Sequence, residues 1–217
     1  MIKIEKTDVF GWESAVRGMR NPMNSWDKSD SVFEPKCCCD EIGCGYTCFV
    51  GENDLSLMKK LVNAGSDHSK FMRMINVTAD ITAPLYWWKE YDTYKVGTVA
   101  NSCSTMHKIH AKEFTLDDFS VEHLFPEVRD AFENTIISAL NTARNCFVRK
   151  PTRKDYWWQM IQLLPTSYNQ KRTVQLNYAV AKNMYFSRRN HKLDEWHDFC
   201  AWVETLPYAE LITGGGD

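Results

Sequence analysis

The chain has 217 residues, of which 44% are hydrophobic and 25% charged, and its formal net charge at pH 7 is -2. This length fits one domain, or one domain with an appendage, and the composition is ordinary for a soluble globular protein. The small net charge argues against a nucleic acid polymer as the main partner, because a phosphate backbone selects a strongly basic face.

Neither a membrane span nor a secretion signal is predicted. No apolar run approaches the roughly 18 residues that cross a bilayer. The first ten residues, MIKIEKTDVF, lack the apolar core of a signal peptide. We therefore expect a cytoplasmic protein with no membrane partner.

The first fifty residues predict a strand, a helix and a cysteine-rich excursion. Ile2–Glu5 alternates as a short strand does, and Trp12–Met19 has helical spacing. Residues 34–51 hold five of the eight cysteines together with a proline and three glycines, so we expect an irregular excursion or a hairpin there.

The next helix has a recognisable beginning and end. Asn53 or Asp54 is a suitable N-cap, and Gly65 is a suitable stop. Between them four apolar residues recur at helical spacing: Leu55, Met58, Leu61 and Val62.

The stretch from Asp67 to Gly97 predicts a strand and then an aromatic helix. Lys70–Val77 is rich in the residue types of a buried or half-buried strand. Asp80 or Thr82 would cap a helix whose first turn contains Pro84. That helix carries five large or cationic side chains: Trp87, Trp88, Lys89, Tyr91 and Tyr94. Five such side chains cannot all lie in a core, so we expect some to line a cleft or a subunit contact.

The remaining chain alternates between helical patterns and one clear strand. Val99–Lys112 is polar and predicts a loop, Glu127–Phe147 is the longest amphipathic helix, and Lys171–Asn177 has the period of a strand. Further helices are predicted at Tyr156–Leu164, Tyr178–Ser187 and Leu193–Leu206. The order predicts a single α+β domain over residues 1–217, in which several long helices cover a small mixed or antiparallel sheet.

The crowded cysteines leave two alternatives open. Without a secretion signal, disulfides are the poorer guess. Cys39, Cys44 and Cys48 are candidate zinc ligands, but the cluster does not form two C-x-x-C pairs with the usual separation. We therefore expect reduced thiols and no metal, with a zinc site as the alternative.

Taken together, three pieces of the chain resemble the flavin-dependent thymidylate synthases (ThyX). The first, residues 53–71 with Gly65, Asp67-His68 and Phe71, resembles the family's D-x-x-L, L-x-x-A-G-H, E-H-x-x-F segment. The second, residues 87–94, falls where the family carries its signature Arg-His-Arg-x-x-Ser-x-Asn-x-x-Ser-x-Arg. The third is Leu164-Pro165 followed by Asn177, Asn183, Arg188 and Leu193-Asp194-Glu195-Trp196. This third piece resembles the carboxy-terminal half of the family, whose pattern is L-P … N-x-R-x-L-x-N-F-x-x-L-R … A-Q-W-E. The resemblance covers most of residues 50–206 and rests on order and spacing more than on identity.

The signature itself is altered. Trp87, Trp88 and Lys89 stand in place of Arg-His-Arg, so one cation is left. The two signature serines fall on Asp92 and Gly97. The signature Asn falls on Tyr94, and the arginine after Asn177 falls on Ala179. A phosphate dianion needs charge-assisted donors, so a carboxylate at Asp92 should repel it or move it. Alternatively, Asn101 and Ser104 restore an N-x-x-S element by a shift of register.

The resemblance implies a nucleotide-binding protein, with FAD as a candidate cofactor. It implies a nucleotide site from Gln170, Lys171, Arg172, Asn177 and Arg188, and a cofactor site from Trp87, Trp88, Lys89, Tyr91 and Asn183. Lys89, Asp92 and Arg188 are the candidates for a catalytic role. If the family reaction is retained, the protein methylates dUMP to dTMP with methylenetetrahydrofolate as the one-carbon donor, and NADPH is also required. The resemblance also implies a homotetramer. The alternative is a non-catalytic member that keeps the fold as a ligand-binding or assembly module. For Trp87 and Trp88, the alternative to stacking on a ring is that one faces the core and the other a subunit interface.

Overall fold

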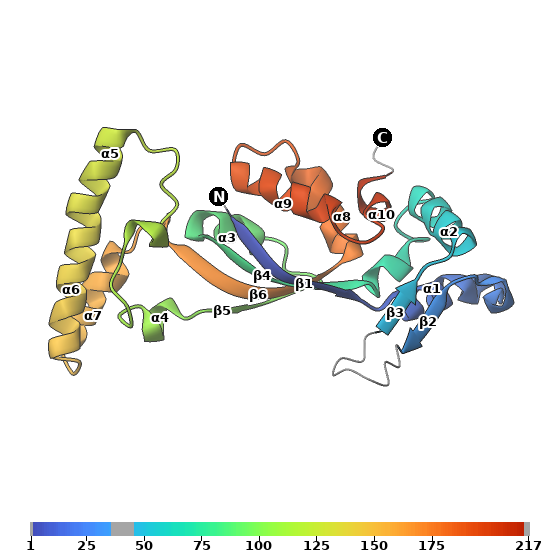
Figure 1. Cartoon of the computed structure of the whole chain (residues 1–217), viewed down its shortest axis with the longest axis horizontal. Coiled ribbons are helices and arrows are strands. Elements are labelled where there is room, and N and C mark those ends of the chain that lie inside the picture. The colour runs from blue at the N-terminus through green and yellow to red at the C-terminus, as the bar shows by residue number, and fades with distance from the viewer. Residues whose placement is uncertain (1, 36–45, 215–217) are drawn as a thin grey trace, which may run out of the picture.

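The structure is a computed structural model that describes residues 2–35 and 46–214 (Figure 1). One antiparallel sheet has the strand order β1-β4-β6-β5, with β1 at Lys3–Phe10, β4 at Asn76–Pro84, β5 at Thr98–Ser102 and β6 at Asn169–Asn177. A separate hairpin pairs β2 (Val32–Pro35) with β3 (Tyr46–Phe49). The helices are α1 (Trp12–Arg20), α2 (Glu52–Asn63), α3 (Leu85–Tyr91), α4 (Thr105–Lys108), α5 (Pro126–Ala131), α6 (Ser138–Arg149), α7 (Lys154–Leu163), α8 (Tyr178–Arg188), α9 (Asp194–Glu204) and α10 (Glu210–Thr213). The expected α+β class is confirmed, and the sheet is antiparallel.

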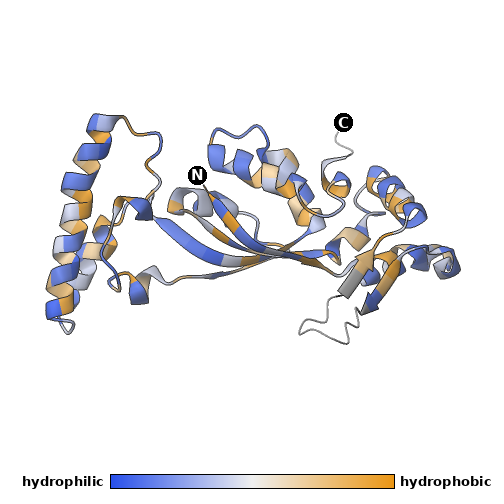
Figure 2. Cartoon of the chain, viewed as in Figure 1, coloured by the Kyte–Doolittle hydropathy of each residue, from blue (hydrophilic) through white to orange (hydrophobic). Residues whose placement is uncertain are grey.

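The sheet has one apolar face and one polar face. In β4 the buried residues Val77, Ala79, Ile81 and Ala83 alternate with Asn76, Thr78, Asp80 and Thr82. Helices α3, α8 and α9 lie above the sheet in Figure 1, and their buried side chains join the same core as the apolar residues of β4. The first part of β6 is hydrophilic in Figure 2. Asp80 and Thr82 are therefore strand residues on the polar face. The expectation that they cap a helix is wrong, since α3 begins after Pro84.

Two further predictions are corrected by the structure. Lys70–Arg73 forms a 3₁₀ turn, and the strand begins only at Asn76. Phe71 and Met72 are adjacent and both buried, whereas a strand of this one-sided sheet would turn one of the two toward the polar face. Within the expected loop Val99–Lys112, β5 pairs with β6 through its backbone, a pairing that its polar side chains do not reveal.

The longest predicted helix is present but does not cover the sheet. α5, a π-helical segment at Phe132–Ile137, and α6 follow one another directly. With α7 they stand beyond one end of the sheet (Figure 1). They pack around a second hydrophobic cluster that includes Leu140, Ala143 and Met160. That both clusters belong to a single domain over residues 1–217 stays a prediction.

Two carboxylates, those of Asp54 and Asp30, join α2 to the segments that precede it. Asp54 is completely buried and accepts hydrogen bonds from Arg20 Nε and the hydroxyls of Ser29 and Ser31, each at 2.6 Å. Burial tends to raise the pKa of Asp54, but these bonds and the Arg20 charge hold it below its ordinary value. The cap of α2 comes from Asp30, whose carboxylate accepts from the N–H groups at positions 53 and 54 at 2.9 and 3.0 Å. Neither Asn53 nor Asp54 is therefore the N-cap.

Replacing Asp54 by Asn should lower the free energy of unfolding at pH 7 by about 3–5 kcal/mol, because it leaves the buried Arg20 guanidinium without its counter-charge. The pKa of Asp54 is lowered by folding, so its contribution is complete above the unfolded pKa and is lost as the pH falls. The difference from the wild type should therefore shrink below about pH 4. Urea unfolding followed by circular dichroism measures both effects. Asp155→Asn, which breaks an exposed Arg–Asp pair, is the control; equal unfolding curves for the two variants would refute the prediction.

Candidate functional site

Arg172 of β6 lies at the centre of a small polar cluster. Its Nε donates to Gln170 Oε1 at 3.0 Å, and its Nη1 donates to Asp92 Oδ1 at 2.7 Å. The guanidinium carbon lies 4.2 Å from the centroid of the Trp88 ring. Gln170 in turn donates to the carbonyl of Cys103 at 2.8 Å. The cluster therefore joins two of the expected nucleotide residues, Gln170 and Arg172, to the carboxylate of Asp92.

Arg188 of α8 is held in a similar way by a residue of α3 itself. It donates to Glu90 Oε2 at 3.1 Å and to the Tyr94 hydroxyl at 2.8 Å. Its guanidinium carbon lies 4.9 Å from the ring of Trp196. Two arginines from different elements are thus each paired with a carboxylate at the carboxyl end of α3. Both guanidinium groups therefore already have a carboxylate partner within the chain.

The aromatic residues of α3 are core residues. Trp87 and Trp88 have no exposed surface, and Tyr91 is buried as well. The Trp87 ring packs against Trp196 with 4.9 Å between ring centroids, and Trp88 Nε1 donates to the Gln170 carbonyl at 2.9 Å. The expectation that these three side chains wall a flavin or base is wrong, because a sealed ring offers no face to a ligand. The alternative in which one tryptophan faces a subunit interface is wrong for the same reason.

Lys171 lies on the opposite, polar face of the sheet. Its Nζ is 3.0 Å from Asp80 Oδ2, and the Thr173 hydroxyl donates to Asp80 Oδ1 at 2.6 Å. These bonds lower the pKa of Asp80, with the hydroxyl of Thr173 as the main cause, and the bond to Asp80 raises that of Lys171. Lys171 is therefore a fully charged cation separated from Arg172 by the sheet.

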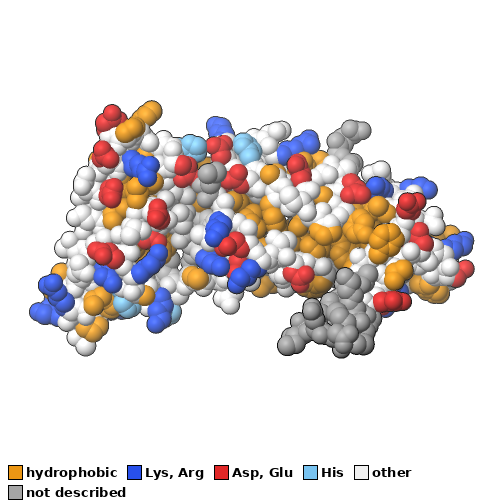
Figure 3. Space-filling model, viewed as in Figure 1, with side chains coloured by type: hydrophobic (Ala, Val, Ile, Leu, Met, Phe, Trp, Pro, Cys, Tyr) orange, Lys and Arg blue, Asp and Glu red, His pale blue; other side chains and the backbone are white. Residues whose placement is uncertain are grey.

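A cavity of about 460 Å³ lies where the polar face meets α4. Its charged lining residues are three lysines and two aspartates: Lys108, Lys112, Lys171, Asp117 and Asp118. Four hydroxyl-bearing residues also line it: Thr82, Ser104, Thr105 and Tyr168. Lys112 is paired with Asp118, whereas Lys108 is exposed and has no carboxylate partner in residues 2–35 and 46–214. Gln170 also lines the cavity and connects it to Arg172. In the view of Figure 3, acidic and basic side chains are interleaved, so the surface seen there does not form a single basic patch.

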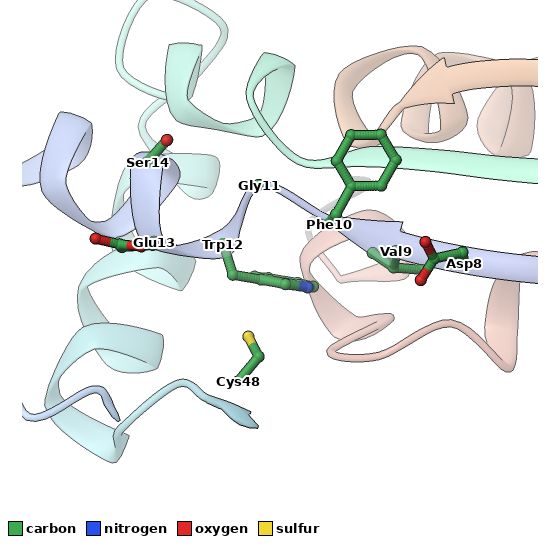
Figure 4. Close-up of a pocket in the computed structure, with 8 residues that line it drawn as sticks. All are labelled: Asp8, Val9, Phe10, Gly11, Trp12, Glu13, Ser14 and Cys48. Atoms are coloured by element: carbon green, nitrogen blue, oxygen red, sulfur yellow. The ribbon is translucent and has the colours of Figure 1, made fainter. Parts of the chain in front are cut away.

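A second cavity, of about 510 Å³, lies between the end of β1 and the start of α1. Figure 4 shows Cys48 of β3 facing the Trp12 ring across it. Burial raises the pKa of the Cys48 thiol. The other two candidate zinc ligands, Cys39 and Cys44, lie outside the described residues. Among the described residues, no group of three His, Cys, Asp or Glu side chains could hold a metal ion.

Known structures identify the architecture, whereas sequence comparisons do not. No family model and no curated protein matches the chain. Two crystal structures of ThyX from Helicobacter pylori, both with FAD and dUMP, superpose on it. One has a TM-score of 0.70 at 16% identity and covers 96% of both chains. The other has a TM-score of 0.69 at 15% identity and covers 97% of this chain and 96% of its own.

The fold is that of the flavin-dependent thymidylate synthases. At this level of identity the likeness concerns the fold alone, and the side chains must be considered one by one. Among the described residues, no helix is long and apolar enough to cross a membrane.

Gly97, where the resemblance puts the second signature serine, lies at a tight corner. Gly97 has a φ of 80°, and a Cβ added there would lie 2.9 Å from a Val180 methyl and 3.1 Å from Asn177 Nδ2. Asn177 caps α8 by accepting from the Val180 N–H at 3.0 Å. A glycine is required by the backbone here, and the amide oxygen of Asn177 is already used.

The other expected residues remain untested in their roles. Lys89 is exposed and forms no ion pair within the described part of the chain. Asn183 is exposed on α8, where its amide oxygen accepts from Ser187 at 3.4 Å. Asp92 and Arg188 remain catalytic candidates, each already in an ion pair.

Sequence reasoning missed the residues that complete the site. Lys108 and Lys112 lie in a segment expected to be a loop, and α4 ends at Lys108, so no periodic pattern in the sequence links the two lysines. Glu90 resembles half of a solvated pair with its neighbour Lys89, but it binds Arg188, which lies 98 positions away. No local pattern contains that contact.

Replacing Trp87 by Ala should lower the free energy of unfolding by about 3–5 kcal/mol, because it opens a cavity in the core. Chemical denaturation measures the loss. Trp158→Ala, at a tryptophan that is 42% exposed, should cost much less. A Trp87 variant as stable as the Trp158 variant would contradict the core role.

Proposed function

We propose that this protein binds a nucleotide on the ThyX-like fold, with the phosphate in the cavity between β6 and α4. The observation that carries the proposal is the gathering of Lys108, Lys112 and Lys171 around that cavity. Its volume of about 460 Å³ lies within the usual range of small-molecule sites. Phosphate oxygens bind best to charged donors, and ammonium groups supply them as point charges.

Neutral donors complete the proposed cavity site. The Thr82 and Ser104 hydroxyls lie in its lining. Burial, helped by the Asp118 carboxylate, raises the pKa of Tyr168, so its phenol keeps its proton at neutral pH. Hydroxyl donors beside ammonium groups suit a phosphate oxygen and the polar edge of a sugar or base.

FAD is the flavin to test, because both superposed ThyX structures contain it together with dUMP. The residues that the resemblance assigns to the flavin do not fit it in the expected way, since Trp87, Trp88 and Tyr91 are sealed in the core. Lys89 and Asn183 are the exposed groups left from that set. We therefore derive no catalytic step through a flavin.

The second candidate is a non-catalytic ligand-binding protein. It is favoured by the ion pairs of Arg172 with Asp92 and of Arg188 with Glu90, which neutralise both guanidinium groups within the chain. A site whose cations are already held by the chain's own carboxylates is poorly suited to the family reaction.

Nucleotide binding is tested by titrating the full chain with dUMP in a calorimeter. The wild type should bind saturably, and Lys108→Gln should weaken binding about tenfold, the loss expected for one charge-assisted hydrogen bond. Lys60→Gln, an exposed lysine on α2 at the far end of the molecule, is the matched control. Absence of binding, or equal weakening in both variants, would rule out the cavity as the phosphate site.

The two candidate functions are separated by the product. Dihydrofolate formed from methylenetetrahydrofolate in the presence of dUMP, FAD and NADPH would establish the family reaction. Saturable dUMP binding without FAD uptake or dihydrofolate would establish the non-catalytic protein.

We also propose that the chain self-associates, as a tetramer by resemblance. The start of the α5–α6 arm exposes Leu124, Phe125 and Val128 together, and Phe125 is 76% exposed. Light scattering after gel filtration should give about four times the chain mass, and Phe125→Ser combined with Val128→Ser should lower it. Met23→Ser, another exposed apolar residue far from the arm in the sequence, should leave the mass unchanged. A monomeric wild type would refute the proposal.

A further inference from the structure

We propose that Arg172 anchors a second anion site, for a phosphate group, which Asp92 occupies in the free protein. This site goes beyond the cavity proposed above. Lys171 and Arg172 are adjacent in β6 and therefore point to opposite faces of the sheet. A phosphate at Arg172 is separate from one held by Lys171.

The Arg172 guanidinium is held in place without Asp92. The ring of Trp88, which is completely buried, lies 4.2 Å beneath the guanidinium carbon. Gln170, also buried, accepts from Nε at 3.0 Å and is itself fixed by its bond to the Cys103 carbonyl. Stacking and one neutral hydrogen bond thus orient the cation in advance, which favours ligand binding by reducing the ordering cost.

The bond to Asp92 is the exchangeable one. The Arg172 side chain is 14% exposed, whereas that of Asp92 is 51% exposed and sits just after the last residue of the short helix α3. Asp92 contacts Nη1 through one oxygen, and Nη2 donates to no acceptor within the described residues. A phosphate has three terminal oxygens and can bind both Nη atoms, so it makes a better partner than this single-oxygen contact.

A second donor stands beside the guanidinium on the edge strand. Ser102 of β5 is directly opposite Arg172 in the antiparallel register, so the two side chains leave the sheet on the same face. Ser102 is exposed, and β5 is an edge of the sheet, so a ligand can approach from that side. A guanidinium with an adjacent hydroxyl is a suitable pair of donors for a phosphate oxygen.

The proposal predicts that removing the competing carboxylate strengthens phosphate binding. Asp92→Asn should bind inorganic phosphate about fivefold more tightly than the wild type, the factor expected for releasing one partly exposed ion pair. Phosphate titration at constant ionic strength, followed by ³¹P NMR, measures the affinity. The melting temperature of the variant should also rise more steeply with phosphate than that of the wild type.

Three further variants test whether the gain in phosphate affinity arises at Arg172. Asp155→Asn breaks an Arg–Asp pair of similar length, 2.6 Å, at an exposed position and should leave phosphate affinity unchanged. Arg172→Gln added to Asp92→Asn should abolish the gain, whereas Lys108→Gln added to it should preserve the gain. The proposed nucleotide cavity and this site can therefore fail independently.

Unchanged phosphate affinity in Asp92→Asn, a gain of the same size in Asp155→Asn, or a gain that survives Arg172→Gln would each overturn the proposal. If Asp92→Asn does not fold, Asp92→Ser is judged by the same criteria. Misfolding of both variants, without recovery in added phosphate, would also overturn it, because Asp92 would then be a structural partner that phosphate cannot replace.

Discussion

The burial of two neighbouring indoles on one short helix is the constraint on which the described site depends. Trp87 and Trp88 follow each other, so they leave α3 in different directions and need cover from more than one element. The Trp87 ring packs against Trp196 of α9. Trp88 contacts β6, where its Nε1 donates to the Gln170 carbonyl and its ring stacks under the Arg172 guanidinium. This packing fixes α3 against β6 and α9. It thereby places Glu90 and Asp92 beside Arg188 and Arg172.

The same packing holds the two arginines beside α3 apart from the lysines that line the cavity at α4. Arg172 and Arg188 are stacked on rings and neutralised by their own carboxylates. Around the cavity at α4, Lys112 and Lys171 are paired with Asp118 and Asp80, and Lys108 is exposed with no carboxylate partner among the described residues.

Elements with a strong local period were predictable from the sequence. The strand at β6 and the helices α8 and α9 follow from alternation or helical spacing, and the structure confirms them within a few residues. The predictions failed where the deciding contact is distant. The cap of α2 comes from Asp30, more than twenty positions earlier, and the partner of Glu90 lies at position 188. The tryptophans were expected in a cleft because a local count of bulky side chains does not show that α9 and β6 cover them.

The left-handed backbone at Gly97 makes this corner hard to rebuild with any side chain. A serine at this position would cost about 1–2 kcal/mol in backbone strain and would press against Val180 and Asn177, which together start α8. A hydroxyl side chain here would thus require the corner and the first turn of that helix to change together.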